Sequence, residues 1–531
     1  MPLAFAQSPT IAPVKVLVPV SDAKGTAIES KAADGKSHPV FRLADDSPLV
    51  RRVYQVLETS FAHQVILLDR YARNLVLSEV GSQSPPQYLT APAYLLMSRE
   101  EGGFSRHGFW LQDAVGKRQL VLAGYVDLVV HQESVEDGNL EEIFSHELGH
   151  QILGELVGHL PPGPARNMHE SMTITDNPTA FDEGFAEHFQ PLVRDATANS
   201  YLHELTLGAT ATDLNVLFIS PLDQQLRTDG VKRNVFIHCK ALPAGALDPS
   251  VDHYRLFLDD QTSTAFINDE LRNGQQMMAS EGVIATLFYR IVNGPALRNQ
   301  YRDAAFYRPF LGGDFTLERV RQVISPYQNV NLKLFAAMRR AAKPIAAGAP
   351  PMIALVNSYA ATFPDEARKI YEAFLETTRG ATASQELADA FERVAADGRR
   401  GDMGAFPRSS GEAFSLLKAA IDHVTSHELP LDANIGPQLW LLNADFKIAP
   451  EVWSSNRTLS FTLNLNTASE VDLMTVPGVD LTMARKIVAA RRARGFFRSL
   501  ADLDTTAPLQ VSARLRSMQE QMKTAPSIPR P

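Results

Sequence analysis

A short stretch in the first third of the chain carries two histidines separated by about one helical turn. Residues 145–150 read Ser-His-Glu-Leu-Gly-His, which places Glu147 between His146 and His150. Residues four apart on an α-helix project from one face, so both imidazoles can point at one metal ion. Glu147 lies about 100° further round the helix, where its carboxylate reaches a water molecule rather than the metal. The stretch predicts a zinc ion held by His146 and His150, with Glu147 as general base.

A second stretch can supply the remaining ligand. Residues 177–190 read Asn-Pro-Thr-Ala-Phe-Asp-Glu-Gly-Phe-Ala-Glu-His-Phe-Gln. Asn177 is expected to cap a helix that has Pro178 at its first position. A catalytic zinc ion has three protein ligands and one open position. We therefore predict Glu183 as the third ligand. Glu187, four residues later, is predicted to accept the outer N–H of a ligand histidine.

The two stretches together resemble the gluzincin pattern of zinc aminopeptidases and their relatives. In that pattern an Asn-Glu-Gly-Phe/Trp-Ala segment supplies the zinc-binding glutamate, which corresponds to Glu183 here. The resemblance implies a zinc cofactor, a peptide or protein substrate and a zincin fold, with Glu187 orienting a histidine. The chain departs from the pattern at Asp182, which stands where asparagine is usual. No upstream exopeptidase motif accompanies it, so aminopeptidase activity is not implied.

The gap between the two stretches is longer than in the gluzincin pattern. An insertion of about residues 160–176 is expected to loop out of the fold. Further along, residues 280–289 resemble the helix that follows in many gluzincins, although the tyrosine often found just before the glutamate, here Glu281, is absent.

Other side chains near the motif are weaker candidates for the site. His188 adjoins Glu187 but is expected on another side of the helix. His169, in the inserted segment, is predicted to be a surface histidine, with coverage of the site as the alternative. Glu141 and Glu142 are predicted to form a solvated face.

A donor to a tetrahedral oxyanion is also needed for peptide hydrolysis. The sequence does not choose among four candidates, which are Tyr289, Tyr307, His253 and Tyr254. The single cysteine, Cys239, excludes an intramolecular disulfide and a multi-cysteine metal site, and it is expected to be buried or incidental.

Hydrophobic periodicity predicts the elements that position these residues. A valine-rich strand is expected at 12–20, an amphipathic helix at 48–79, and short strands at 88–96, 109–111 and 120–130. The motif helix is expected to begin at Asn139, with Glu142 completing a capping box, and to stop at Gly158. From 139 to about 440 the pattern is mainly helical.

This pattern predicts the α+β class, and the gluzincin resemblance implies that the small sheet and the active-site helix form a zincin-like catalytic domain. A mainly helical lobe and a small helix-hairpin-helix domain are expected to follow. The predicted domains are a β-rich segment at 1–47, the catalytic domain at 48–200, a helical lobe completing the cleft at 201–445, and a β linker with the helix-hairpin-helix module at 446–531.

The C-terminal region resembles helix-hairpin-helix modules of the competence-protein and secretion-pseudopilin kind over residues 463–504. Ser469 is expected to start the first helix, Pro477 and Gly478 to form the hairpin, and residues 484–491 to form the second helix. In DNA-binding members, backbone N–H groups of a Gly-x-Gly hairpin hold a phosphate. Asp480 replaces the second glycine here, and its carboxylate would repel a phosphate.

The same region is nevertheless basic. Residues 463–531 hold 10 Lys and Arg against 6 Asp and Glu, a net charge of +4 within a chain of net charge −9. The cluster comprises Arg485, Lys486, Arg491, Arg492, Arg494 and Arg498. A DNA or protein partner therefore remains possible through 463–504, beside a purely structural role.

Two classes of function remain at this stage. The chain is either a zinc metallopeptidase with an accessory module, or a nucleic-acid- or protein-binding factor with a structural metal site. The intact Glu147 favours the enzyme, because a structural site has no use for a general base. No apolar run is long enough for a transmembrane segment. Ala4-Phe5-Ala6-Gln7 resembles a signal-peptidase site and slightly favours export to the periplasm or medium over a cytoplasmic location.

Overall fold

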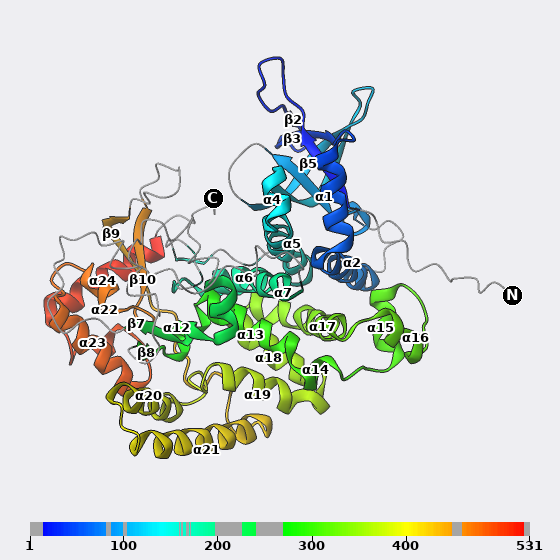
Figure 1. The fold of residues 1–531 in the computed structure, drawn as a ribbon. Helices are drawn as coiled ribbons and strands as arrows, with labels where there is room; N and C mark the ends of the chain where they lie inside the picture. Colours follow the sequence, from blue (N-terminus) through cyan, green and yellow to red (C-terminus); the bar gives the residue numbers. More distant parts are fainter. Residues whose placement is uncertain are drawn as a thin grey trace. The chain divides into compact units, whose positions relative to one another are not determined.

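The computed structural model describes residues 14–80, 86–98, 103–158, 160, 163–165, 169, 171, 173–196, 226–240, 269–448 and 459–524. The chain divides into two compact units. The first comprises Met1–His159, Phe185–Leu205 and Val292–Ala342, and the second comprises Leu160–Gly184, Thr206–Ile291 and Lys343–Pro531. Figure 1 labels many of the helices and strands of both units.

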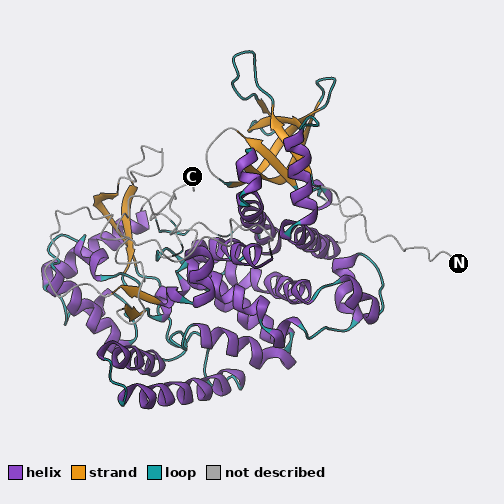
Figure 2. Ribbon diagram, viewed as in Figure 1, coloured by secondary structure: helices purple, strands orange, loops and turns teal. Residues whose placement is uncertain are grey.

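The first unit contains a six-stranded mixed sheet, ordered β1-β4-β6-β5-β3-β2. Its strands are β1 (Lys15–Pro19), β2 (Glu29–Lys31), β3 (Ser37–Leu43), β4 (Tyr94–Ser98), β5 (Phe104–Gln112) and β6 (Arg118–Val129). Strand β1 also pairs with β3, which closes five strands into a small barrel. The strands of segment 1–47 and those of 94–129 therefore belong to one sheet, which is orange in Figure 2.

The interior of this barrel is aromatic. The ring centroids of Phe41, Phe109 and Tyr125 lie between 5.2 and 5.5 Å apart, and all three side chains are buried. Because side chains alternate between the two faces of a strand, Val121, Ala123 and Tyr125 of β6 all lie in this core. The predicted strand at 88–96 is only partly correct, since its first residues form the short helix α3 (Gln87–Thr90).

Helices of the first unit pack against the barrel and against one another. The predicted helix at 48–79 is broken at Ser60, whose backbone is extended, so it forms two helices. Besides α3, the described helices of this unit are α1 (Pro48–Thr59), α2 (Phe61–Val80), α4 (Gln132–Glu136), α5 (Asn139–Val157), α7 (Phe189–Ala196), α14 (Pro295–Arg298), α15 (Ala304–Leu311), α16 (Leu317–Val323) and α17 (Pro326–Ala346), whose end extends into the second unit.

A buried ion network joins α2 to the helix of the histidine motif. Arg73 lies 3.1 Å from Asp69 and 2.8 Å from Glu155, and the guanidinium is almost completely buried. Truncating one member of such a network leaves a charge without compensation, so the pairing holds α5 in register on α2. The barrel also contacts α5, where a Cβ placed on Gly124 would lie 2.6 Å from Gln151.

The second unit is mainly helical and includes two two-stranded sheets. Its elements are α6 (Asn177–Glu187), η2 (Leu226–Gly230), α10 (Val231–Arg233), η3 (Val235–Ile237), β7 (His238–Lys240), β8 (Asp269–Leu271), α12 (Gly274–Met278), α13 (Glu281–Asn293), α18 (Pro351–Thr362), η5 (Pro364–Glu366), α19 (Ala367–Thr377), α20 (Gln385–Arg400), α21 (Ala405–Thr425), β9 (Trp440–Ile448), β10 (Leu459–Asn464), α22 (Glu470–Met474), α23 (Leu481–Arg494), η6 (Leu500–Leu503) and α24 (Leu509–Thr524). Among the described helices, none is long and apolar enough to cross a membrane.

Candidate metal centre

Helix α5 carries the histidine motif in its middle turns, but it begins differently from the prediction. Gly138 occupies the cap position with a φ of 86°, a value that favours glycine. Asn139 is therefore the first helical residue rather than the cap, and its backbone and side-chain N–H groups both donate to Asp137. The helix spans Asn139–Val157, so the predicted cap at Asn139 is wrong by one residue, whereas the predicted stop at Gly158 is confirmed.

The two histidines of α5 lie side by side. Their ring centroids are 5.0 Å apart, with an angle of 77° between the ring planes. His146 and Glu147 are each only 8% exposed, and His150 is partly buried. The helical spacing thus places two imidazoles on one face, as expected from a repeat of 3.6 residues.

Helix α6 presents the acidic residues of the second stretch. Its cap is Asp176 rather than the predicted Asn177: the Asp176 carboxylate accepts the backbone N–H of Thr179 at 2.8 Å. The boundary between the two units falls inside α6, after Gly184, and the last turn of the helix belongs to the first unit. That turn packs closely on α5, since a Cβ placed on Gly149 would lie 3.1 Å from Cα of Ala186.

This helix pair brings the predicted ligands together. His146, His150 and Glu183 each offer one ligand atom, and these atoms lie within 4.8 Å of one another. Two imidazole nitrogens and one carboxylate oxygen form a donor set of the catalytic-zinc type, with three protein ligands and room for a fourth, external one. The residues present therefore fit a zinc ion, and their role as ligands stays a prediction.

Glu147 lies beside the start of strand β5. A Cβ placed on Gly103, which immediately precedes that strand, would lie 2.9 Å from Oε1 of Glu147 and 2.8 Å from Ile143. A larger residue at 103 would therefore collide with the predicted base. The backbone at Gly103 is thus closely packed against the carboxylate of Glu147.

Glu187 and His188, at the end of the second stretch, are fully buried. Glu187, the predicted partner of a ligand histidine, lies one turn after Glu183 and has no exposed surface. His188 follows the helix, and its ring N–H donates to the Phe185 carbonyl. Burial lowers the pKa of His188 to about 3, so this imidazole is neutral. Among the described residues, no metal-binding cluster includes His188.

The prediction that Glu141 and Glu142 form a solvated face is wrong. Both carboxylates are buried, because α2 and α7 cover the start of α5. Glu141 accepts the backbone N–H of Phe61 at 3.0 Å. Glu142 accepts from Gln190 at 2.9 Å and from Arg194 at 3.0 Å, which explains why it does not complete a capping box.

His169 has acidic neighbours that its position in the inserted segment does not reveal. Its side chain is 46% exposed, consistent with a surface histidine, yet Nδ1 lies 3.7 Å from Glu183 and 3.4 Å from Glu281. Burial lowers the pKa of His169, but the two carboxylates outweigh that effect and raise it to about 9. His169, Glu183 and Glu281 also offer ligand atoms within 4.8 Å of one another.

The inserted segment reaches Glu281 through backbone hydrogen bonds. The N–H of Thr175 donates to the Ala279 carbonyl at 2.8 Å, and the N–H of Gly282 donates to the Ser171 carbonyl at 3.0 Å. The described parts of the insertion are therefore attached to the start of α13. This attachment explains why a histidine from the insertion lies beside the first residue of that helix.

The four candidates for an oxyanion donor have different outcomes. Tyr307 is buried, and its hydroxyl donates to Asn329 at 2.5 Å and accepts the backbone N–H of Arg302, so it has a structural role. Tyr289 lies on α13, partly buried. His253 and Tyr254 lie outside the described residues, as do residues 4–7 of the suggested export signal.

The C-terminal module has the helices that its sequence predicts. Ser469 caps α22 in a capping box with Asp472, and Gly478 turns the chain at a φ of 88°. The second helix, α23, is longer than the predicted 484–491. Its cap is Asp480, whose carboxylate accepts the N–H of Met483 at 2.8 Å. The backbone position that would hold a phosphate in a DNA-binding hairpin is thus occupied by this carboxylate.

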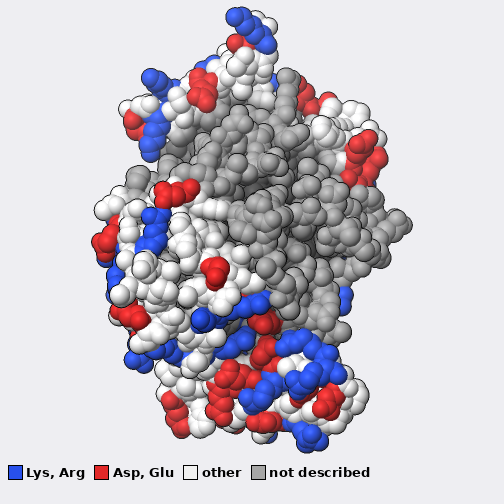
Figure 3. All heavy atoms as spheres, turned by 90° about the vertical axis from the view of Figure 1, so that its left-hand side faces the viewer, with Lys and Arg blue, Asp and Glu red and all other residues white. Residues whose placement is uncertain are grey.

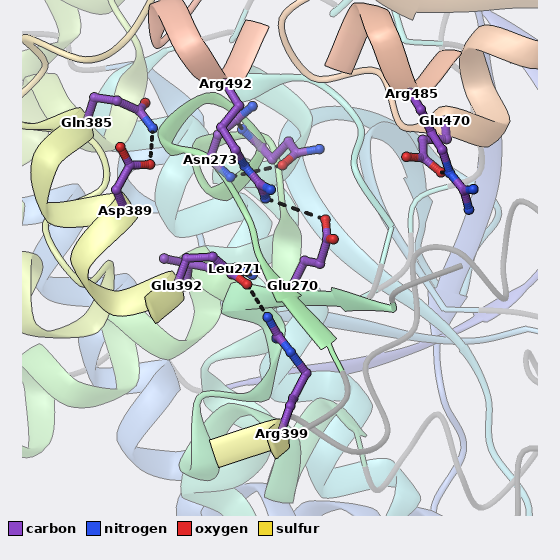
Figure 4. Close-up of polar contacts among 11 residues, drawn as sticks. Glu270, Leu271, Asn273, Gln385, Asp389, Glu392, Arg399, Glu470, Arg485 and Arg492 are labelled. Atoms are coloured by element: carbon purple, nitrogen blue, oxygen red, sulfur yellow. Dashed lines mark hydrogen bonds and ion pairs between the residues drawn. The ribbon is translucent and has the colours of Figure 1, made fainter. Parts of the chain in front are cut away.

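The basic residues of this module mostly contact the protein itself. Arg491 is buried and donates to the Leu465 and Ala468 carbonyls at 3.0 and 2.7 Å. Figure 4 shows Arg492 directed at Glu270, at 3.5 Å, and Arg485 beside Glu470. On the face drawn in Figure 3, Lys and Arg side chains are interspersed with Asp and Glu rather than forming a uniform basic surface.

Comparison with known proteins supports one part of this description. Residues 461–512 match the helix-hairpin-helix motif, which confirms the module predicted at 463–504. No curated protein and no solved structure matches the chain.

Proposed function

We propose that the chain is a zinc-dependent metallopeptidase that cleaves peptide bonds. The observation that carries the proposal is the convergence of His146, His150 and Glu183, with Glu147 on the same helix. A structural metal site gains nothing from a buried carboxylate placed one residue after a ligand. Zinc bound by these three side chains would act as a Lewis acid that polarises a carbonyl and acidifies water.

The residues of the chain supply the remaining steps of hydrolysis. The Glu147 carboxylate accepts a proton from the attacking water and later delivers it to the leaving amine. The Glu147 side chain is only 8% exposed. The last turn of α6, which follows Glu183, packs on Gly149 of α5.

Strand β5 gives a reason to favour a peptide as substrate. Its first residues, Phe104–His107, pair with β6 on one side, whereas the pairing of β5 with β3 involves only Trp110 and Leu111. Within the described residues, the other edge of 104–107 has no strand partner. An extended peptide can add to such an edge through its backbone. Gly103 lies at the end of this edge, beside Glu147.

The Glu147→Gln variant tests this proposal. Hydrolysis of an unfolded protein or a fluorogenic peptide library is expected to fall about 100- to 10,000-fold, the usual contribution of a general base. Zinc content is expected to stay at the wild-type level, because Glu147 is not a ligand. Glu133→Gln is the matched control, since Glu133 is an exposed glutamate on the preceding helix α4. Equal hydrolysis by Glu147→Gln and Glu133→Gln would refute the assignment.

For the helix-hairpin-helix module we propose a structural role, in which it contacts another part of this chain, rather than nucleic-acid binding. Asn273 and Gln276, which form the capping box of α12, donate to the Asn466 and Thr467 carbonyls at 3.1 and 3.0 Å. These contacts attach the module to the helix that precedes Glu281. The module therefore supports the segment that carries that glutamate.

Fluorescence anisotropy with a labelled DNA duplex tests this second proposal. At physiological salt we expect a dissociation constant no tighter than the non-specific range of about 1 to 100 µM. Arg485, Arg491 and Arg492 have intramolecular contacts, and Asp480 repels phosphate. Submicromolar binding that weakens steeply with added salt would contradict the proposal.

A further inference from the structure

Glu281 is a buried carboxylate that lies beside a histidine and an arginine. It is the first residue of α13 and has no exposed surface. Neither of its oxygens has a hydrogen-bond partner among the described residues. The nearest cationic groups are His169, 3.4 Å from Oε2, and Arg227, 3.7 Å from Oε1. Both ion pairs are longer than hydrogen bonds, and buried oxygens that lack a hydrogen bond are candidate ligand atoms for a metal ion.

The neighbours of Glu281 form a set of donors suited to a cation. His169 and Glu183 each offer an atom within 4.8 Å of one on Glu281, the dimension of a coordination sphere. One imidazole and two carboxylates suit a divalent transition-metal ion. Arg227 lies 3.7 Å from Oε1, and His169 lies 3.4 Å from Oε2.

We propose that His169, Glu183 and Glu281 bind a second divalent cation next to the predicted zinc site. Glu183 belongs to both clusters, and a carboxylate has two oxygens, so this residue would bridge the two ions. Paired metal ions in hydrolases lie about 3.5–4 Å apart, a spacing that one bridging carboxylate spans. The proposal rests on the proposed metallopeptidase function for its first ion, and it assigns the chain to the two-metal class.

The fold explains how this second cluster arises. The insertion brings His169 to the start of α13 through the backbone bonds of Ser171 and Thr175. Helix α6 crosses α13 at Gly184, where an added Cβ would lie 2.8 Å from the Glu281 carbonyl. Glu183 therefore lies next to Glu281 because a residue without a side chain follows it.

Zinc stoichiometry of the full-length chain tests the proposal. The protein is stripped with a chelator, reloaded with zinc chloride and passed over a gel-filtration column before metal analysis. We expect about two zinc ions per chain in the wild type and in Glu147→Gln. Glu281→Gln and His169→Ala are each expected to halve the zinc content. His169 is 46% exposed, so its variant tests the site without disturbing a core.

The outcomes separate this proposal from the proposed function. A wild type with one zinc ion, unchanged by Glu281→Gln and by His169→Ala, would overturn the second site even if Glu147→Gln abolishes hydrolysis. A halved zinc content in both variants would support the second site even if Glu147→Gln hydrolyses peptides at the wild-type rate. In that case the metallopeptidase assignment fails and the cation site stands.

Discussion

At the scale of single residues, Asp480 shows how one side chain changes what a familiar motif can do. It stands where DNA-binding hairpins have their second glycine, and its carboxylate caps α23. The N–H groups at the start of a helix otherwise attract a phosphate. With a carboxylate in that place, the helix gains a cap and loses an anion site.

Because Asp480 caps α23, we expect its substitution to change the stability of the protein. Asp480→Ala is expected to lower the free energy of unfolding by about 1 kcal/mol, because the N–H of Met483 loses its acceptor. Asp480→Asn, which keeps a side-chain oxygen, is expected to lose much less. Urea unfolding of the full-length chain measures both variants. Equal losses in the two variants would show that charge, rather than capping, determines the effect.

At the scale of elements, the geometry of the site depends on close approaches between helices. Gly184 allows α6 to cross α13: a Cβ there would lie 2.7 Å from Cβ of Ile284 and 2.9 Å from the backbone nitrogen of Ala285. Backbone atoms cannot move aside without shifting a whole helix. The glycine of the Glu-Gly-Phe-Ala stretch is therefore required by packing, independently of any metal.

Alanine substitution tests this contact between elements. Gly184→Ala is expected to cost about 1–3 kcal/mol through overpacking and to weaken zinc binding, because the shift displaces Glu183. Gly154→Ala is the matched control: this glycine is exposed in α5 with nothing within 4 Å of an added Cβ. The control is expected to gain up to about 1 kcal/mol from helix propensity. Thermal unfolding and zinc titration measure both. Comparable stability of the two variants would argue against the tight crossing.

At the scale of the whole molecule, the barrel and the site are both assembled from distant segments. Strand β1 lies in the sheet beside β4, although about eighty residues separate them in the chain. Alternation of apolar residues predicts that a strand forms and which face is buried, but not which strand it pairs with. The closed sheet was for that reason not foreseeable from the pattern.

The sequence alone determined the features that depend on near neighbours. Helix α5, the shared face of His146 and His150, and the helix-hairpin-helix module all follow from patterns spanning a few turns. The same local signals failed at the helix caps, where Gly138 and Asp176 compete with the asparagines that follow them.

Only the tertiary structure decided which residues surround the face of α5 that carries His146 and His150. Glu142 is buried because α7 packs on it, and His169 lies beside Glu281 because the insertion bonds to the start of α13. Residues about a hundred positions apart approach one another only through the packing of complete helices, and periodicity within one helix carries no information about its partners. The local pattern thus fixes the histidine pair, whereas long-range packing determines its acidic neighbours.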